Sequence, residues 1–420
     1  MKKLAFVFSG QGSQKVGMGK KFCEQFTVAN RTFEEASDVI GIDLKKICFE
    51  GSTNELTKTE NAQPAILTTS VAMFRVFMQE LGIEPYYIAG HSLGEFSALT
   101  AAESIEFSDA VQIVRQRGKF MQESVELGEG KMVAIGGISQ KQIMATCIEF
   151  NSNNDQVVIS NFNSPNQIVI SGHQKAVDKV SQHLLNIGAR VTPLKVSAAF
   201  HSPLMEHAAL KLEDELKKYK FQDPKWPIIS NVDAEPYNQA IDVIPNLVTQ
   251  MTAPVQWRKT MEFFSRIGIT DCVELGPQAV LRNLVQKNSS DMRAFSYDYE
   301  DDRQALHKCF SNQQPIGSII TRALAIAVST KNYNYNHEEY QIGVIEPYRQ
   351  IQKIQENIEN GGVEPTVEQM QEAINMLCSV FHTKQTPIKV QQERFRQLFY
   401  ETGTYGLFPG LPVEMEVGER

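Results

Sequence analysis

Long hydrophobic runs are absent from this 420-residue sequence. No apolar segment approaches the roughly 20 residues that a membrane-spanning helix needs. The N-terminus has two lysines and a short apolar run, residues 4 to 8, which superficially resembles a secretion signal. Because that run stops at a glycine turn, it suits a first core strand better than a signal peptide. We therefore expect no membrane association.

Cysteine is scarce, and an excess of positive charge is missing. The six cysteines lie far apart with no C-x-x-C spacing, which argues against a zinc site or a disulfide framework and indicates a cytoplasmic protein with reduced thiols. The formal net charge is −8, so the chain lacks the basic footprint that nucleic acid attracts. We expect neither a bound metal nor a nucleic acid partner.

The chain does have enough apolar residues, 42% of the total, to bury a large core. Over residues 1–127, short apolar strands alternate with helical patterns. "LAFVF" leads into "GQGSQ", and "YYIAG" leads into "HSLGEFSALTAA". This order predicts an α/β domain with a mostly parallel sheet. The pattern resumes after residue 200, so we assign residues 198–310 to the same domain.

Residues 128–197 interrupt this pattern with the order β-α-β-β-α-β. That order predicts a small ferredoxin-like subdomain inserted within the larger domain. The turn "NSPN" separates its second and third strands, and Gly188 follows its second helix as a C-cap. Strands are expected at residues 131–137, 156–162, 167–173 and 190–196, and helices at 139–150 and 174–188.

Residues 311–420 form a polar, mostly helical C-terminal extension. Thr366 and Gln369 make a capping-box pattern before one helix. Thr386, followed by a proline, begins another. This extension either packs on the main domain or offers a partner a surface, and packing is the simpler interpretation.

Ser92 lies in "GHSLG", a G-x-S-x-G pattern between an apolar strand pattern and a helical one. A sharp turn in that position exposes the serine oxygen at the sheet edge, and the helix N-terminus favours developing negative charge. A serine in a purely structural turn is the alternative. The strand-to-helix context favours a nucleophile.

A serine nucleophile needs a base, and the sequence offers eight histidines. His91 adjoins the serine but should point away from it across the turn. His183 and His207 lie within helical patterns and are most simply surface residues. His201 follows the last strand of the inserted unit, where the chain returns to the α/β core, and is the best of several candidates.

A series of motifs in order along residues 1 to about 310 resembles the malonyl-CoA:acyl-carrier-protein acyltransferases of fatty acid and polyketide synthesis. The motifs are "FVFSGQGSQ", "NAQPAILTTSVA", "AGHSLGEFSAL", "VRQRGKFMQES", "NFNSPNQIVISG", "AFHSPLM", "ISNVDA", "PVQWRKTM" and "VELGPQAVL". The resemblance implies an α/β-hydrolase-like large domain with the inserted ferredoxin-like subdomain. It does not extend into the helical C-terminal extension, which looks like that of some discrete acyltransferases serving modular polyketide synthases.

The resemblance also implies roles for particular residues. Ser92 is the acylated nucleophile and His201 its general base, with Gln256 of "PVQW" orienting the histidine. The backbone N–H groups of Gln11 and Leu93 form the oxyanion hole, an arrangement that can stabilise a tetrahedral intermediate by several kcal/mol.

Arg117 of "RGKFMQ" corresponds to the family arginine that binds the free carboxylate of malonate, for which a planar guanidinium is well suited. Leu93 and Phe200 resemble the malonyl type rather than the methylmalonyl type of enzyme. "NFNSP" contacts substrate or only forms a turn, and we favour the turn.

The expected activity is malonyl transfer from malonyl-CoA to the phosphopantetheine thiol of an acyl carrier protein, through an acyl-serine, in trans for a polyketide synthase. The expected protein is a monomer that needs no bound cofactor. Three alternatives stay open: a housekeeping fatty acid malonyltransferase, an editing acyl hydrolase on the same fold, and a non-catalytic docking module.

Overall fold

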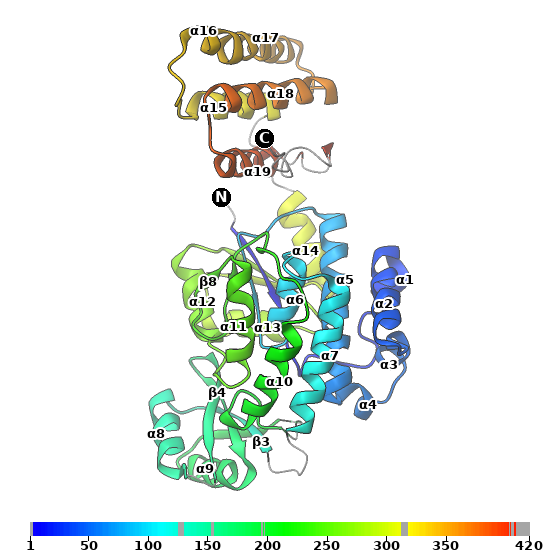
Figure 1. Cartoon of the computed structure of the whole chain (residues 1–420), viewed down its shortest axis with the longest axis vertical. Helices are drawn as coiled ribbons and strands as arrows, with labels where there is room; N and C mark the ends of the chain where they lie inside the picture. Colours follow the sequence, from blue (N-terminus) through cyan, green and yellow to red (C-terminus); the bar gives the residue numbers. More distant parts are fainter. Residues whose placement is uncertain are drawn as a thin grey trace. The chain divides into compact units, whose positions relative to one another are not determined.

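The structure is a computed structural model, and it describes residues 3–124, 130–152, 155–194, 196, 198–311, 318–402, 404, 407 and 408. The chain divides into two compact units, Met1–Leu306 and His307–Arg420, which are drawn together in Figure 1. The division falls within α14 (Glu300–Ser311), close to the expected end of the α/β domain at residue 310. The expected subdomain boundaries at 127/128 and 197 lie outside the described residues.

A six-stranded sheet forms the centre of the first unit, in the order β10-β9-β1-β2-β7-β8. The strand β1 is parallel to both of its neighbours, and only β8 pairs antiparallel. The mostly parallel sheet is therefore confirmed. The strands are β1 Leu4–Phe8, β2 Tyr87–Gly90, β7 Ile228–Ile229, β8 Pro236–Tyr237, β9 Asp271–Leu275 and β10 Arg293–Ser296.

Helices cover both faces of this sheet, and β1 shows why its sequence is apolar throughout. Phe6 packs edge-on against Phe77 of α5, with ring centroids 4.9 Å apart. Ala5 and Val7, on the other face, belong to a core cluster with residues of α12 and α13. A strand buried on both faces needs a continuous apolar run. The covering helices include α5 Thr59–Glu80, α6 Gly94–Ala101, α7 Phe107–Glu123, α10 Glu206–Leu216, α11 Val243–Gln250, α12 Trp257–Arg266 and α13 Val280–Asn288.

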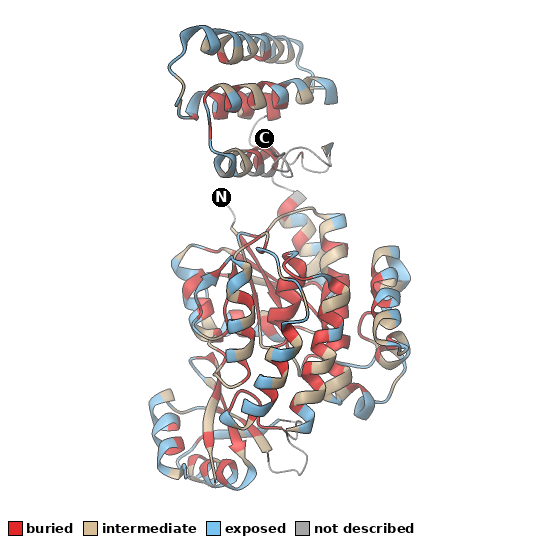
Figure 2. Ribbon diagram, in the orientation of Figure 1, coloured by how far each residue is buried: buried red, intermediate tan, exposed pale blue. Residues whose placement is uncertain are grey.

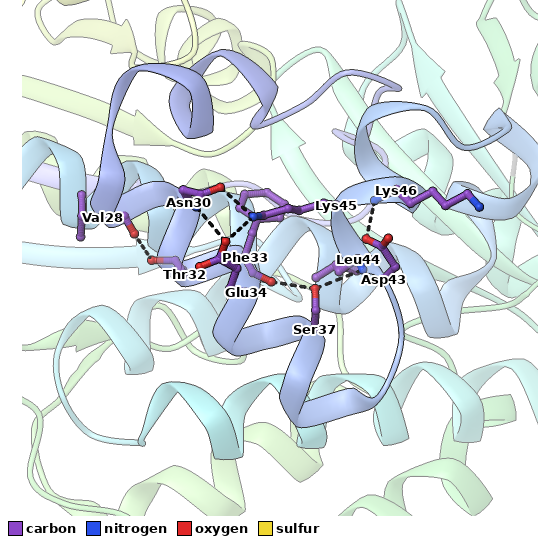
Figure 3. A network of polar contacts seen from close by, with 10 residues as sticks. All are labelled: Val28, Asn30, Thr32, Phe33, Glu34, Ser37, Asp43, Leu44, Lys45 and Lys46. Atoms are coloured by element: carbon purple, nitrogen blue, oxygen red, sulfur yellow. Dashed lines mark hydrogen bonds and ion pairs between the residues drawn. The ribbon is translucent and has the colours of Figure 1, made fainter.

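Four short helices near the N-terminus lie beside α5 (Figure 1): α1 Lys20–Gln25, α2 Thr27–Ile40, α3 Leu44–Phe49 and α4 Thr53–Thr57. Polar contacts join α2 to α3 (Figure 3). Lys45 Nζ donates to Asn30 Oδ1 at 2.6 Å and to Glu34 Oε1 at 2.9 Å. The Leu44 N–H donates to Ser37 Oγ at 3.2 Å. These contacts fix the two helices against each other at the surface.

The inserted subdomain has a four-stranded sheet in the order β4-β5-β3-β6, in which every pair is antiparallel. Together with the order of its helices this is the expected ferredoxin-like arrangement. Strand β4 continues through Ser164, so only Pro165 and Asn166 of the expected turn "NSPN" lie outside the ladder. Gly188 has φ 94° after the second helix. The elements are β3 Gly130–Gly136, α8 Gln140–Phe150, β4 Val157–Ser164, β5 Gln167–His173, α9 Gln174–Asn186 and β6 Arg190–Pro193.

The second unit is mostly helical over its described residues, and its buried stretches lie where its helices face one another (Figure 2). Its buried apolar residues form one core cluster. Leu377, Phe381 and Leu398 are among its fully buried residues. The capping box predicted at Thr366 is present. Its elements are α15 Ile319–Ser329, α16 His337–Tyr340, the π-helical turn η3 Gln341–Ile345, α17 Glu346–Gly361, α18 Val367–Thr383 and α19 Ile388–Thr402.

Among the helices of the described residues, none has both the length and the apolar character that crossing a membrane requires. No disulfide joins any of the six cysteines, all of which lie in the described part of the chain.

Candidate active site

Ser92 occupies a sharp turn between β2 and α6. Its φ of 54° lies in the left-handed region, a conformation that costs energy for a residue other than glycine. The flanking glycines are required by space. A Cβ on Gly90 would lie 1.9 Å from the carbonyl carbon of Gly94, and a Cβ on Gly94 would lie 2.0 Å from the Phe8 oxygen. The G-x-S-x-G pattern is therefore a strand–turn–helix elbow.

His201 lies far from Ser92 in the sequence, but the two side chains are in contact in the folded chain. Its Nε2 lies 2.7 Å from Ser92 Oγ, and its Nδ1 lies 2.8 Å from the backbone oxygen of Gln250. A carbonyl oxygen can only accept, so Nδ1 carries the proton and donates it. The lone pair on Nε2 then faces the serine hydroxyl, as a general base requires.

Burial keeps this histidine neutral. The His201 side chain is enclosed, with 3% of its surface exposed. Burial, and then the positive charge of Arg117, lower the pKa of His201 from 6.5 to about 3. A neutral imidazole is the form that accepts a proton from serine.

The sequence predicted that Gln256 orients His201, but in the structure the contact comes from Gln250. The Gln256 N–H donates to the Asn231 carbonyl at 2.8 Å, and Gln256 precedes the first turn of α12. The carbonyl that holds His201 Nδ1 belongs instead to Gln250, the last residue of α11. Matching "PVQW" to the family pattern selected a residue six positions too late, because sequence order alone does not show which glutamine reaches the histidine. A glutamine ending an apolar helix pattern was the available signal.

Arg117 projects from α7 into the same site. Its side chain is almost fully buried, with 1% exposed. Nη1 donates to Gln63 Oε1 and Nη2 donates to Gln250 Oε1, both at 3.0 Å, and Nη2 also lies 3.4 Å from Ser92 Oγ. Burial lowers the pKa of Arg117 to about 10, and the nearby negative charge of Glu95 opposes that shift. The guanidinium remains a cation at neutral pH.

Glu95 is a buried charged residue that the sequence analysis missed. It lies in the first turn of α6 and is 0% exposed. Its carboxylate accepts from Gln250 Nε2 at 2.8 Å, the Tyr237 hydroxyl at 2.9 Å and the Asn231 N–H at 3.3 Å. Burial raises the pKa of Glu95 to about 7, while these donors lower it. A lone glutamate within the apolar helix "GEFSALTA" was the signal that could have identified it.

Leu93 follows Ser92 and is the N-cap residue of α6. The N–H groups from Gly94 onward bond back to carbonyls of the turn, and the N–H of Ser92 donates to Asn231 Oδ1 at 2.7 Å. Within the described turn, the Leu93 N–H has no backbone acceptor. It is therefore the first N–H of this turn that can bind an oxyanion.

The loop after β1, which carries Gln11, touches the same turn. A Cβ on Gly10 would lie 2.2 Å from the His91 carbonyl oxygen, so the backbone beside Gln11 lies directly against the elbow. The loop is held from behind, since Ser9 Oγ donates to the buried Glu274 at 2.9 Å and Ser13 Oγ donates to the Gly10 carbonyl at 2.8 Å.

The remaining candidates lie as follows. His91 Nε2 is 2.9 Å from Asn163 Oδ1, and its ring packs near Trp257 with centroids 5.6 Å apart. The ring is therefore bonded away from Ser92, as predicted.

Phe200 is buried and directly precedes His201. Within the described residues, no group of three or more potential ligand side chains is placed to hold a metal ion.

Comparison with known proteins agrees with this geometry. A family model described as "Acyl transferase domain" matches residues 5–300. A malonyl CoA-acyl carrier protein transacylase of Escherichia coli strain K12 is 44% identical over 289 residues, 68% of this chain and 93% of the relative. A solved type II PKS acyl-carrier protein in complex with its malonyl-transacylase contains a chain with 39% identity and a TM-score of 0.71, covering 73% of this chain and 100% of that one.

The chain therefore belongs to the acyl transferase family, among the malonyl-CoA:acyl-carrier-protein transacylases. A further relative, a malonyl CoA-acyl carrier protein transacylase of Bacillus subtilis, is 40% identical over 391 residues, which are 92% of this chain and 98% of that protein. Its similarity extends into the second unit, whereas the Escherichia coli protein matches only about the length of the first.

Proposed function

We propose that the protein transfers a malonyl group from malonyl-CoA to the phosphopantetheine thiol of an acyl carrier protein through an acyl-Ser92 intermediate. The observation that carries this proposal is the contact of 2.7 Å between Ser92 Oγ and His201 Nε2, beside the buried cation of Arg117. Family membership supports the same reaction.

In the first half-reaction, Ser92 Oγ attacks the thioester carbonyl while its proton passes to His201 Nε2. The N–H groups of Leu93 and Gln11 bind the resulting oxyanion. When the C–S bond breaks, the imidazolium returns its proton to the departing thiolate of CoA. The Gln250 carbonyl holds the ring by Nδ1 throughout.

In the second half-reaction, the carrier's thiol gives its proton to His201 Nε2 and its sulfur attacks the acyl-serine. Collapse of the tetrahedral intermediate breaks the C–O bond, and Ser92 Oγ recovers the proton. These steps use acid–base and nucleophilic groups alone, so we propose that no bound cofactor takes part.

Arg117 is proposed to bind the free carboxylate of the malonyl group. Its Nε is buried and has no hydrogen-bond partner among the described residues. A buried donor without an acceptor costs about 1–3 kcal/mol. A carboxylate bound against the guanidinium would supply acceptors and form the charge-assisted pair for which this planar group is suited. Phe200 is proposed to line the acyl site beside His201.

We propose that the acceptor is a carrier protein of a polyketide synthase, served in trans by a cytoplasmic monomer. The solved complex of a malonyl-transacylase with a type II PKS acyl-carrier protein supports a carrier of this kind. The second unit, into which the similarity to the Bacillus subtilis relative extends, distinguishes this chain from the shorter Escherichia coli protein and is consistent with a separate carrier. A fatty acid carrier is the alternative, and loading rates on the two kinds of carrier would decide between them.

Hydrolysis of the acyl-serine by water is the competing activity on this fold. The buried Arg117 favours transfer, because a malonyl-specific site suits loading rather than the removal of varied acyl groups. The lifetime of the acyl-enzyme without carrier protein separates the two activities, since a hydrolase turns over rapidly and a transferase does not.

Replacement of Ser92 by alanine tests the proposal. Incubation with malonyl-CoA should add one malonyl group to the wild-type protein, detectable by intact-mass spectrometry. We expect the Ser92→Ala variant to lose this labelling by about a thousandfold or more, since the nucleophile is gone. Replacement of Ser97, which lies in α6 directly after this turn, is the matched control. Persistent labelling of Ser92→Ala would refute the proposed intermediate.

A further inference from the structure

Arg117 and ionised Glu95 carry opposite charges within one buried cluster, yet a neutral side chain stands between them. The Gln250 amide joins the two: its Nε2 donates to Glu95 Oε2 at 2.8 Å, and its Oε1 accepts from Arg117 Nη2 at 3.0 Å. All three side chains are at most 1% exposed. The two charges therefore meet through the amide rather than in a direct ion pair.

The orientation of this amide is fixed from both ends. A carboxylate can only accept hydrogen bonds and a guanidinium can only donate them. The Gln250 amide must therefore turn Nε2 towards Glu95 and Oε1 towards Arg117. Nε2 also donates to the Ser92 carbonyl at 3.1 Å, which holds the amide beside the nucleophile.

The spacing matters because opposite charges attract strongly when they are buried. Arginine and a carboxylate form bidentate pairs when nothing separates them. Such a pair between Arg117 and Glu95 would use the N–H groups that an acyl carboxylate needs. With the amide between them, Glu95 still balances the charge of the guanidinium. Its negative charge raises the pKa of Arg117, whereas burial lowers that pKa.

We propose that the Gln250 side chain determines acyl-group specificity by acting as a neutral spacer. It holds Glu95 close enough to neutralise Arg117 and far enough to leave the guanidinium available to the carboxylate of a dicarboxylic acyl group. This inference rests on the proposed function, because it requires Arg117 to bind that carboxylate.

Gln63 provides a matched comparison. Its Oε1 accepts from Arg117 Nη1 at 3.0 Å, the same distance as in the Gln250 contact. Its Nε2, however, donates to Met121 Sδ at 3.3 Å and not to a carboxylate. Loss of the Gln63 amide removes one acceptor from Arg117 without bringing an anion closer.

The experiment compares single-turnover acylation of the full-length protein by malonyl-CoA and by acetyl-CoA, followed by intact-mass spectrometry. Gln250→Met keeps the backbone carbonyl that holds His201 and removes the amide. We expect its malonyl-to-acetyl rate ratio to fall about tenfold or more, as Arg117 turns to Glu95. For Gln63→Met we expect a fall of less than about threefold.

A second substitution supplies the rescue. In the double variant Gln250→Met/Glu95→Gln no anion remains to capture Arg117, so the ratio should return to within about threefold of wild type. If Gln250 had only a structural role, the ratio would not recover in the double variant, because Glu95→Gln would disturb the site further. Where methionine prevents folding, Gln250→Asn tests the same point, because its side chain is too short to join both partners.

An equal fall in malonyl and acetyl rates for Gln250→Met would overturn the inference and leave the proposed function intact. A larger effect from Gln63→Met, or no rescue by Glu95→Gln, would overturn it as well. If the wild-type protein takes up neither acyl group, the proposed function fails and the inference fails with it.

Discussion

The two units of the chain bury their polar groups in different ways. In Met1–Leu306, buried side chains from helices far apart in the sequence bond to one another, as Arg117 does with Gln63 and Gln250. In the described part of His307–Arg420, buried Lys384 Nζ donates to the backbone carbonyls of Ala327 and Thr330 at 2.7 and 2.9 Å. The first unit buries a network of side chains around the candidate site. The second uses a buried lysine to satisfy carbonyls near a helix end and joins Arg322 of α15 to the buried Glu401 of α19.

This difference distinguishes a unit whose buried polar groups form a candidate active site from a unit whose buried lysine stabilises the fold. Lys384 satisfies carbonyls that would otherwise be left without donors where α15 ends, which is a structural role. In the first unit, burial instead leaves Arg117 Nε without an acceptor and holds the pKa of His201 far below its ordinary value. Such costs persist where they serve chemistry. The side chains proposed to carry the chemistry of acyl transfer, Ser92, Arg117 and His201, all lie in the first unit.

Among the changes that test the difference between the two units, removal of the Arg117 guanidinium should have the largest effect on acylation. For Arg117→Ala we expect the malonyl acylation rate to fall about a hundredfold more than the acetyl rate, because a charge-assisted carboxylate contact is lost. Parallel single-turnover assays with the two acyl-CoAs measure this. Arg115→Ala on the same helix is the control, since Arg115 donates to the Ile40 carbonyl outside the site. Equal losses for both acyl groups would show that Arg117 does not bind the carboxylate.

The second largest effect concerns the pH dependence of the acylation rate, which the lowered pKa of His201 should shift. Because the pKa of His201 is lowered to about 3, its base form persists far below the ordinary pKa of 6.5. We expect the rate of acetyl-Ser92 formation to show no loss from histidine protonation between about pH 8 and pH 5.

In Arg117→Ala, a nearby positive charge is gone, so the pKa of His201 should rise. The acid limb of the rate profile should then appear at higher pH than in wild type. An acid limb near pH 6.5 in the wild-type protein would contradict the buried, neutral histidine.

Removal of the second unit should have a smaller effect. A chain ending after residue 311 keeps every residue assigned to the site, so we expect its rate of acylation by malonyl-CoA to stay within about threefold of the full chain. Transfer to carrier protein is measured on the same samples. A loss confined to that second step would assign the helical unit to carrier binding, and a loss of acylation itself would contradict the separation of the two units.

A core substitution in the second unit should have the smallest effect on acylation. Leu377 is fully buried, and Leu377→Ala should destabilise this unit by about 2–5 kcal/mol without changing the acylation rate. Hydrogen exchange followed by mass spectrometry measures the local loss of protection. Glu372→Ala, at an exposed position of the same helix, should change stability by at most about 0.5 kcal/mol. Reduced acylation in Leu377→Ala would show that the two units depend on each other.

Local patterns in the sequence were sufficient for the elements and for the strand–turn–helix elbow that carries Ser92. The capping box at Thr366, the elbow at Ser92 and the strands of the ferredoxin-like subdomain depend on residues within a few positions of one another. Hydrophobic periodicity and glycine placement record such short-range requirements directly. The end of β4 was placed too early, because its last pairs depend on β5 and not on the turn residues alone.

The sequence by itself determined the fold class, the elbow serine and, through its ordered motifs, the family. Only the tertiary structure decided which glutamine holds His201, and that Glu95 shares the site with Arg117. These contacts join residues more than 100 positions apart in the case of Glu95 and Gln250. No local pattern specifies them, because a buried side chain is selected by the partners that surround it after folding. The serine can therefore be found from its neighbours in the chain, and its environment only from its neighbours in space.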